Sequence, residues 1–179
     1  MSYTLRPAAD EYVDIFGRYI VRVPDGDIID ILRRQAHDTT ARLRGLPDTR
    51  AEWAYAPDKW TIKEVVGHLA DVERVMSYRA LRFAREDATP LPSFDENTWT
   101  PAGRFGERSL DNLLDDFMAV RNATVSLFDG IPADAWTLRG TFSGGTFSVR
   151  AIACIICGHE RHHVAVLEER YGVPAISAH

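Results

Sequence analysis

The chain has 179 residues, of which 45% are hydrophobic and 26% are charged, and its formal net charge is −5. This length and composition are typical of one globular domain, and we expect a single domain over residues 1–179. The acidic balance argues against nucleic-acid binding, which needs a clustered basic surface. The four arginines between residues 33 and 44 lie among aspartates and indicate a solvated helix face.

Membrane insertion and disulfide bonding are also unexpected. The longest strongly apolar run, Ala151 to Cys157, is too short to span a bilayer, and the first 24 residues lack the apolar core of a signal peptide. The two cysteines, Cys154 and Cys157, both lie inside that run, where small core side chains are the better interpretation. These features predict a cytoplasmic protein that is not inserted in a membrane.

Four segments have the apolar spacing of an amphipathic helix. They cover about residues 27–46, 61–85, 109–129 and 148–171. The second begins with a capping box formed by Thr61 and Glu64, and the last ends at Gly172, shortly before Pro174. Helices of this length predict an all-α protein with a four-helix bundle.

Two connections carry further signals. In residues 87–108, several prolines and glycines discourage regular structure, and connections this long are often functional. Either this connection walls a binding pocket or it packs over one end of the bundle. Residues 136–147 contain Gly144 and Gly145 between two short β-compatible runs, which predicts a small hairpin before the last helix. The pocket-wall candidates in the long connection are Phe94, Asp95, Glu96, Asn97 and Trp99.

Three histidines are candidates for a metal site. On a helix, His159 and His163 lie about 40° apart and one turn from each other, on the face that carries the isoleucines of the last helix. Desolvating two imidazoles without a common partner is costly, and a shared metal ion removes that cost. His68, beside Val72 on the second helix, can face the same interior. His162 falls well away from this direction, and we exclude it.

Other interpretations of these histidines are weaker. Each inward histidine alone is compatible with an ordinary hydrogen-bonded core residue. Residues 159–163 also match the H-E-x-x-H pattern of zinc proteases, with Glu160 as general base, but only 16 residues follow His163 and no edge strand is evident. A di-iron bundle site needs a second Glu-x-x-His, and the sequence has no second copy.

The segments 60–73, WTIKEVVGHLADVE, and 158–163, GHERHH, resemble the DinB/YfiT-like family. The resemblance covers most of the chain from the first helix to Gly172. It implies an up-down-down-up four-helix bundle in which His68, His159 and His163 hold a divalent metal. It also implies a homodimer, and activities that include S-transfer with low-molecular-weight thiols such as bacillithiol or mycothiol, and metal-dependent hydrolysis.

Three neutral imidazoles leave coordination positions open on a metal ion, which is typical of catalytic sites. Together with what the family resemblance implies, this open site makes a metal-dependent S-transferase our leading hypothesis, in which the metal activates a low-molecular-weight thiol against a small-molecule substrate. A metal-dependent hydrolase and a non-catalytic, metal-stabilised stress or binding protein are the alternatives. Zinc or nickel is expected before iron or manganese, although imidazole suits several metals.

Three carboxylates lie close to the histidines in sequence. Asp71 and Glu64 are each about one turn from His68 and could orient its imidazole by accepting its free N–H. Glu160 flanks the last-helix pair and could move protons. We take Glu160 and Asp71 as the candidate catalytic residues, with a solvated surface charge as the alternative for each.

Overall fold

The computed structural model describes residues 6–87 and 89–175; the two ends of the predicted domain, 1–5 and 176–179, and residue 88 lie outside the described residues. All four predicted helices are confirmed. Helix α2 ends earlier than expected because Arg44 is extended and Gly45 has a φ of +86°, which ends the helix before Leu46. The bundle helices are α2 (Ile28–Leu43), α4 (Ile62–Ala84), α6 (Leu110–Asp129) and α7 (Val149–Tyr171).

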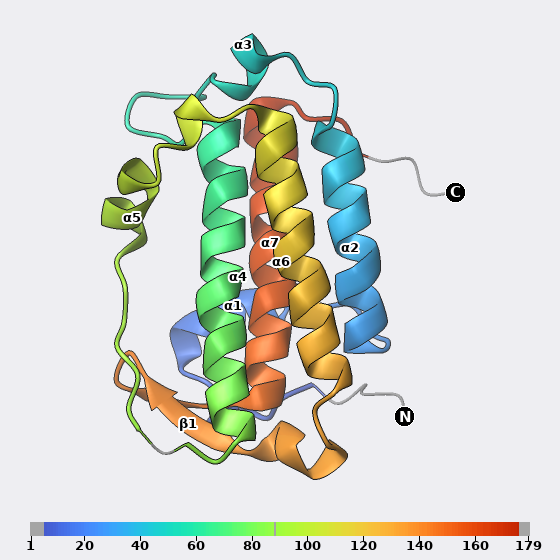
Figure 1. The fold of residues 1–179 in the computed structure, drawn as a ribbon, viewed down its shortest axis with the longest axis vertical. Helices are drawn as coiled ribbons and strands as arrows, with labels where there is room; N and C mark the ends of the chain where they lie inside the picture. Colours follow the sequence, from blue (N-terminus) through green and yellow to red (C-terminus); the bar gives the residue numbers. More distant parts are fainter. Residues whose placement is uncertain (1–5, 88, 176–179) are drawn as a thin grey trace.

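The bundle has the up-down-down-up topology that the family resemblance implied. In Figure 1, α2 and α7 run upward, while α4 and α6 run downward. Because α4 and α6 are parallel, the chain must return along the length of the bundle between them, which explains the long connection. This connection contains the short helix α5 (Glu96–Ala102) and a 3-10 turn, Phe105–Glu107, so the prediction that it is irregular is wrong.

The structure shows why the long connection and the helix ends form as they do. The side chain of Asp95 caps α5 by accepting from the Asn97 backbone N–H at 3.0 Å, and Pro101 is confined to the last turn of that helix. The predicted capping box of α4 is confirmed: Thr61 Oγ1 accepts from Glu64 N at 3.2 Å, and Glu64 Oε2 accepts from Thr61 N at 2.7 Å.

The predicted hairpin is confirmed at the lower end of the bundle (Figure 1). Strands β1 (Arg139–Phe142) and β2 (Gly145–Ser148) are antiparallel, and both turn residues, Ser143 and Gly144, have positive φ, as a tight hairpin turn requires. Leu91 of the long connection lies beside β1 and donates its N–H to Thr141 O at 2.9 Å. The hairpin therefore fixes one end of the connection.

The segment before α2 packs against the last helix. It contains two 3-10 turns, Ala9–Glu11 and Asp14–Phe16, followed by α1 (Gly17–Ile20). A Cβ atom at Gly158 of α7 would lie only 2.0 Å from the backbone oxygen of Tyr19, so glycine is what lets these two backbones approach so closely. Two further short elements are α3 (Asp48–Ala51) and the 3-10 helix Ala133–Thr137.

The first half of helix α7 is buried on all sides. Every residue from 151 to 160 is buried, because α1, α2 and α4 all pack against it. Cys154 and Cys157 are both free and buried, which confirms their interpretation as core residues. The thiol of Cys157 donates to Gln35 Oε1 at 3.1 Å. The apolar run seen in the sequence is thus a helix covered on several sides.

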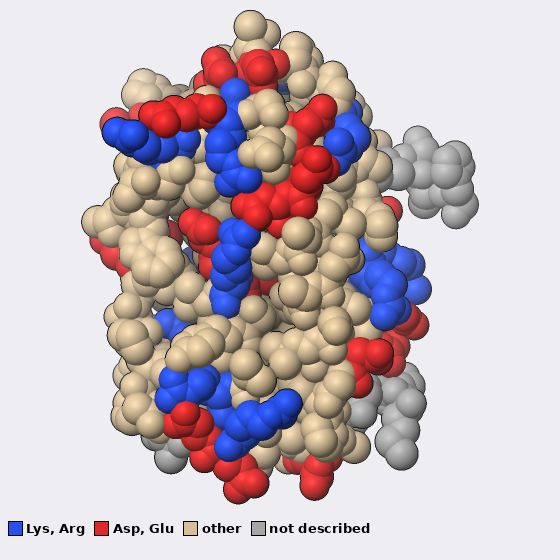
Figure 2. Space-filling model, in the orientation of Figure 1, with Lys and Arg blue, Asp and Glu red and all other residues tan. Residues whose placement is uncertain are grey.

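The surface carries mixed charge. On the face shown in Figure 2, lysines and arginines alternate with acidic residues. Ion pairs join Asp115 of α6 to Arg44 at the end of α2, and Asp116 of α6 to Arg108 just before α6. None of the described helices combines the length and the apolar character needed to cross a bilayer.

Candidate metal centre

The three predicted histidines come together between α4 and α7. His68 Nε2 lies 3.1 Å from His159 Nε2, and His163 Nε2 lies 3.2 Å from the same atom. The first two side chains are buried, with residue exposures of 6% and 7%, and His163 is half-buried. Helices α4 and α7 thus place three imidazole nitrogens within 4.8 Å of one another.

The three nitrogens have the arrangement of metal ligands. A neutral imidazole Nε2 carries either one hydrogen or one lone pair, so His159 cannot satisfy both neighbours by ordinary hydrogen bonds. Two nitrogens that are each about 2.0–2.1 Å from one ion lie about 3.0–3.4 Å from each other. The observed separations fall in that range, and the triad can therefore hold a divalent metal ion. Imidazole suits several transition metals, so three histidine ligands do not determine which metal is bound.

Burial keeps the triad in the protonation state that a metal needs. It lowers the pKa of His68 to about 4 and that of His163 to about 3. The pKa of His159 is also held well below its ordinary value, first by burial and then by the neighbouring histidines. All three imidazoles are therefore neutral at pH 7, and each has a lone pair for an ion.

Two aromatic side chains that the sequence analysis missed hold the imidazoles in place. The ring of Trp60 lies 4.6 Å from that of His68 and is stacked 6.3 Å from that of His163. The ring of Tyr19 meets His159 edge to face at 5.3 Å. Trp60 stands directly before the α4 capping box, inside the family-like motif, whereas nothing local in the sequence around Tyr19 indicates a role.

A cavity of about 350 Å³ opens onto the triad. Of the residues that the sequence analysis proposed as a pocket wall, Phe94 and Glu96 do line it. Asp95 instead caps α5, and the ring of Trp99 lies against that of Phe94, tilted by 33°, with the ring centroids 4.8 Å apart. The remaining lining is largely apolar and includes two arginines; it comprises Ile15, Phe16, Arg18, Tyr19, Trp60, Val72, Met76, Arg79, Ser143, Ile155 and His162.

The structure places Glu160 in a buried ionic network, so the alternative of a solvated carboxylate is wrong. Its carboxylate accepts from Thr39 Oγ1 and Gln35 Nε2, both at 2.5 Å, and from Arg121 Nη2 at 2.8 Å. Burial raises the pKa of Glu160, and the charge of Arg121 opposes that rise. These partners lie on α2 and α6, whereas the triad lies between α4 and α7. The catalytic role of Glu160 stays a prediction.

The two carboxylates near His68 in sequence do not reach it. Asp71 pairs with Arg74 at 3.4 Å, and burial raises the pKa of its carboxyl. Glu64 belongs to the capping box of α4. Within residues 6–87 and 89–175, no hydrogen bond joins either carboxylate to His68. The catalytic role of Asp71 also stays a prediction.

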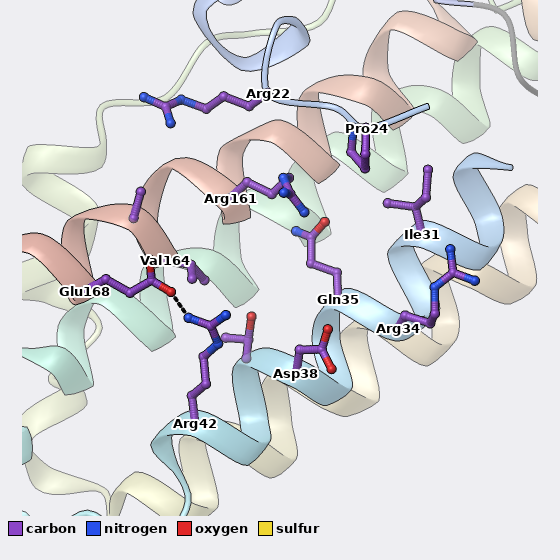
Figure 3. Close-up of a pocket in the computed structure, with 12 residues that line it drawn as sticks. Arg22, Pro24, Ile31, Arg34, Gln35, Asp38, Arg42, Arg161, Val164 and Glu168 are labelled. Carbon is purple, nitrogen blue, oxygen red and sulfur yellow. Dashed lines mark ion pairs between the residues drawn. The ribbon is translucent and has the colours of Figure 1, made fainter. Parts of the chain in front are cut away.

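A second cavity, of about 550 Å³, lies between α2 and α7 and contains none of the triad histidines (Figure 3). Figure 3 shows Arg42 paired with Glu168 across it. Arg22, Arg34 and Arg161 also line it, and all three are exposed. This cavity is therefore a polar, open groove, unlike the pocket at the triad.

Comparisons with known proteins agree with this architecture. A model of the DinB superfamily matches residues 31–167. No curated protein matches the chain. Among solved structures, the chain is similar to YfiT from Bacillus subtilis, described as a probable metal-dependent hydrolase with an unusual four-helix bundle topology. The TM-score is 0.74 over 96% of this chain and 95% of YfiT, at 15% identity, which shows a shared fold. Because the family model runs from α2 to α7, the chain belongs to the DinB superfamily.

Proposed function

We propose that the protein is a divalent-metal-dependent hydrolase of a small molecule. The observation that carries this proposal is the convergence of three neutral Nε2 atoms at the wall of a 350 Å³ cavity. An ion held by three imidazoles keeps coordination positions open and supplies Lewis-acid activation of a substrate oxygen or of water. Hydrolysis needs only water as second substrate, and the fold-level analogy to YfiT favours it over thiol transfer.

The chain's own residues have separable tasks in this proposal. His68, His159 and His163 would hold the ion, and their low pKa values keep them available at neutral pH. Trp60 and Tyr19 fix the imidazole rings by packing against them. The apolar part of the cavity excludes water from the substrate body, which strengthens electrostatic interactions at the reacting group.

The test compares zinc-loaded wild type with two histidine variants. Ester, amide and phosphoester panels are assayed without thiol and again with added cysteine or glutathione. Release of product without thiol, lost in His163→Ala and kept in His37→Ala, supports the hydrolase. His37 is the control because it is an exposed histidine of α2 that lies outside both the triad and its cavity.

Two outcomes would replace the hydrolase proposal. Product that appears only with a thiol, together with consumption of that thiol, would establish the S-transferase that the resemblance first suggested. Zinc that raises the unfolding temperature while every panel stays silent would favour a metal-stabilised binding protein instead.

A further inference from the structure

A buried arginine in the pocket at the triad forms no ion pair with any residue that the structure describes. Arg79 of α4 lines the cavity at the triad and is only 3% exposed. Its Nη2 donates to Pro92 O at 2.7 Å, and its Nη1 approaches the weak acceptor Met76 Sδ at 3.4 Å. Two of the five N–H groups of this guanidinium are thus engaged, and the other three have no acceptor in the part of the chain that the structure describes.

Among the described residues, no carboxylate in the pocket pairs with this charge. Glu96 lines the same cavity, but it is exposed and forms no ion pair with Arg79. The guanidinium lies over the rings of Phe142, at 4.0 Å, and Phe94, at 5.6 Å, which offsets only part of the cost of desolvation. Burial lowers the pKa of Arg79 to about 10, which still leaves it charged at neutral pH.

Other arginines in the protein show the contrast. Arg121, equally buried, is paired with both Glu73 and Glu160. Arg34, which has no ion-pair partner among the described residues, is exposed to water in the groove between α2 and α7. Arg79 is deeply buried, has no carboxylate partner within residues 6–87 and 89–175, and borders an open cavity.

Arg79 and the triad line the same cavity and are separated along its wall by apolar side chains. Arg79 Nη1 touches Met76, which lies eight residues beyond His68, or about 12 Å along the axis of α4. Val72 and Ile155 line the same cavity. A ligand that reaches both ends therefore needs an apolar body between its two polar groups.

We propose that Arg79 binds a carboxylate of the substrate, so that the protein acts on amphipathic monocarboxylates whose reacting bond lies several carbon–carbon bonds from that carboxylate. A planar guanidinium with free N–H groups matches a carboxylate, and its single charge is balanced by a single anion. This inference rests on the proposed function for the reaction, but binding of the carboxylate can be measured without any reaction.

The first experiment titrates zinc-loaded protein with 6-phenylhexanoate and with its neutral amide, 6-phenylhexanamide, by calorimetry. Arg79→Met is expected to weaken binding of the carboxylate by about 10-fold to 100-fold, because a charged hydrogen bond is lost, and to leave binding of the amide unchanged. Arg34→Gln, which removes an arginine from the other cavity, is the control and should bind both ligands like wild type. Wild-type affinity of Arg79→Met for the carboxylate would overturn the proposal.

Stability gives a second, independent readout. A buried guanidinium without a bound anion destabilises the free protein. Arg79→Met should therefore unfold at the same urea concentration as wild type or at a higher one. If Arg79→Met does not fold, Arg79→Lys takes its place, since lysine keeps the charge and loses the planar fork. Arg79→Lys should bind the carboxylate more weakly than wild type with unchanged affinity for the amide; equal losses for both ligands would count against a carboxylate site.

An activity measurement separates this inference from the hydrolase proposal. Mono-4-nitrophenyl sebacate carries its carboxylate eight methylene groups from the ester carbonyl, which matches the separation along α4, and 4-nitrophenyl decanoate is the neutral ester of equal length. Arg79→Met should lower kcat/KM for the sebacate ester about 10-fold or more and leave the decanoate ester unaffected. If wild type hydrolyses neither ester, the hydrolase proposal loses support, while the calorimetric titration still decides the role of Arg79.

Discussion

Single residues on one helical turn have very different surroundings in this protein. His159 and His163 face the triad, whereas His162 lies at the rim of the pocket with its ring 5.8 Å from that of Tyr19. This division follows from helical angles alone, which is why it could be predicted from the sequence. Trp60 lies inside the family-like motif, but its contacts with the imidazoles and the place of Arg79 in the pocket could not be predicted, because both depend on how distant elements pack.

The ligand set makes a direct prediction about metal content. His68→Ala, His159→Ala and His163→Ala should each lose most of the bound metal, because two imidazoles hold an ion far more weakly than three. His162→Ala should keep it. Elemental analysis of the purified variants, dialysed side by side, measures the stoichiometry. A full complement of metal in both His68→Ala and His163→Ala would rule out the proposed ligands.

Glu160 shows where local reasoning fails. In a helix with one solvated face, the residue after an inward histidine can point to water, and the sequence left this alternative open. Position 160 instead faces α2 and Arg121 of α6, and the solvated face of α7 begins at the exposed Arg161. The side chain is therefore directed at Arg121, whose Nε and Nη2 also donate to the two oxygens of Glu73 at 2.7 Å.

Removing the charge of Glu160 should destabilise the fold. Glu160→Gln leaves Arg121 with one carboxylate in a buried site, and we expect a loss of about 2–4 kcal/mol in the free energy of unfolding. Glu169→Gln, at an exposed position of α7, is the matched control and should change stability by less than about 0.5 kcal/mol. Urea unfolding of the metal-free proteins measures both. A neutral result for Glu160→Gln would show that this network contributes little to stability.

At the scale of elements, the sequence predicted the four long helices and the hairpin, because each has its own periodicity and cap. The parallel arrangement of α4 and α6 came only from the family resemblance, since periodicity contains no direction of packing. Helix α5 was missed because prolines and glycines dominate its surroundings, while its signal is one capping residue, Asp95. The homodimer implied by the resemblance stays a prediction.

The close contact between α1 and α7 can be tested at Gly158. Gly158→Ala would place a methyl group against the backbone oxygen of Tyr19, and backbone cannot move aside as a side chain can. We expect a loss of about 2 kcal/mol or more in stability, measured by chemical unfolding. Gly106→Ala is the control, because a Cβ there meets no atom within 4 Å. Equal stability of the two variants would mean that α1 can withdraw from α7 at little cost.

For the whole molecule, Glu11 ties the segment before α1 to the last helix. Its carboxylate accepts from Ser148 Oγ at 2.7 Å, from Arg150 Nε at 2.6 Å and from Ala8 N at 3.0 Å. The hydrogen bond from Arg150 is the main reason that the pKa of Glu11 falls from 4.5 to about 2. The first described residues are thereby fixed to the bundle through one buried charge.

This lowered pKa predicts acid sensitivity. Because the folded protein holds Glu11 ionised, its contribution of about 2–3 kcal/mol is complete above pH 4.5 and is lost as the pH falls toward 2. The stability difference between wild type and Glu11→Gln should therefore shrink over that interval. Urea unfolding of both metal-free proteins at pH 6, 4 and 3 measures this stability difference. A difference that stays constant with pH would exclude the ionised carboxylate as its cause.

The return connection between α4 and α6 has a consequence for how this architecture can diversify. It contributes Phe94 and Glu96 to the pocket, whereas the three histidines of the triad belong to α4 and α7. One end of the connection is held by the pairing of Leu91 with the hairpin, and the other leads into α6. Mutations between these two points can alter the shape of the pocket without disturbing the triad, so the pocket wall and the three histidines can change independently in evolution.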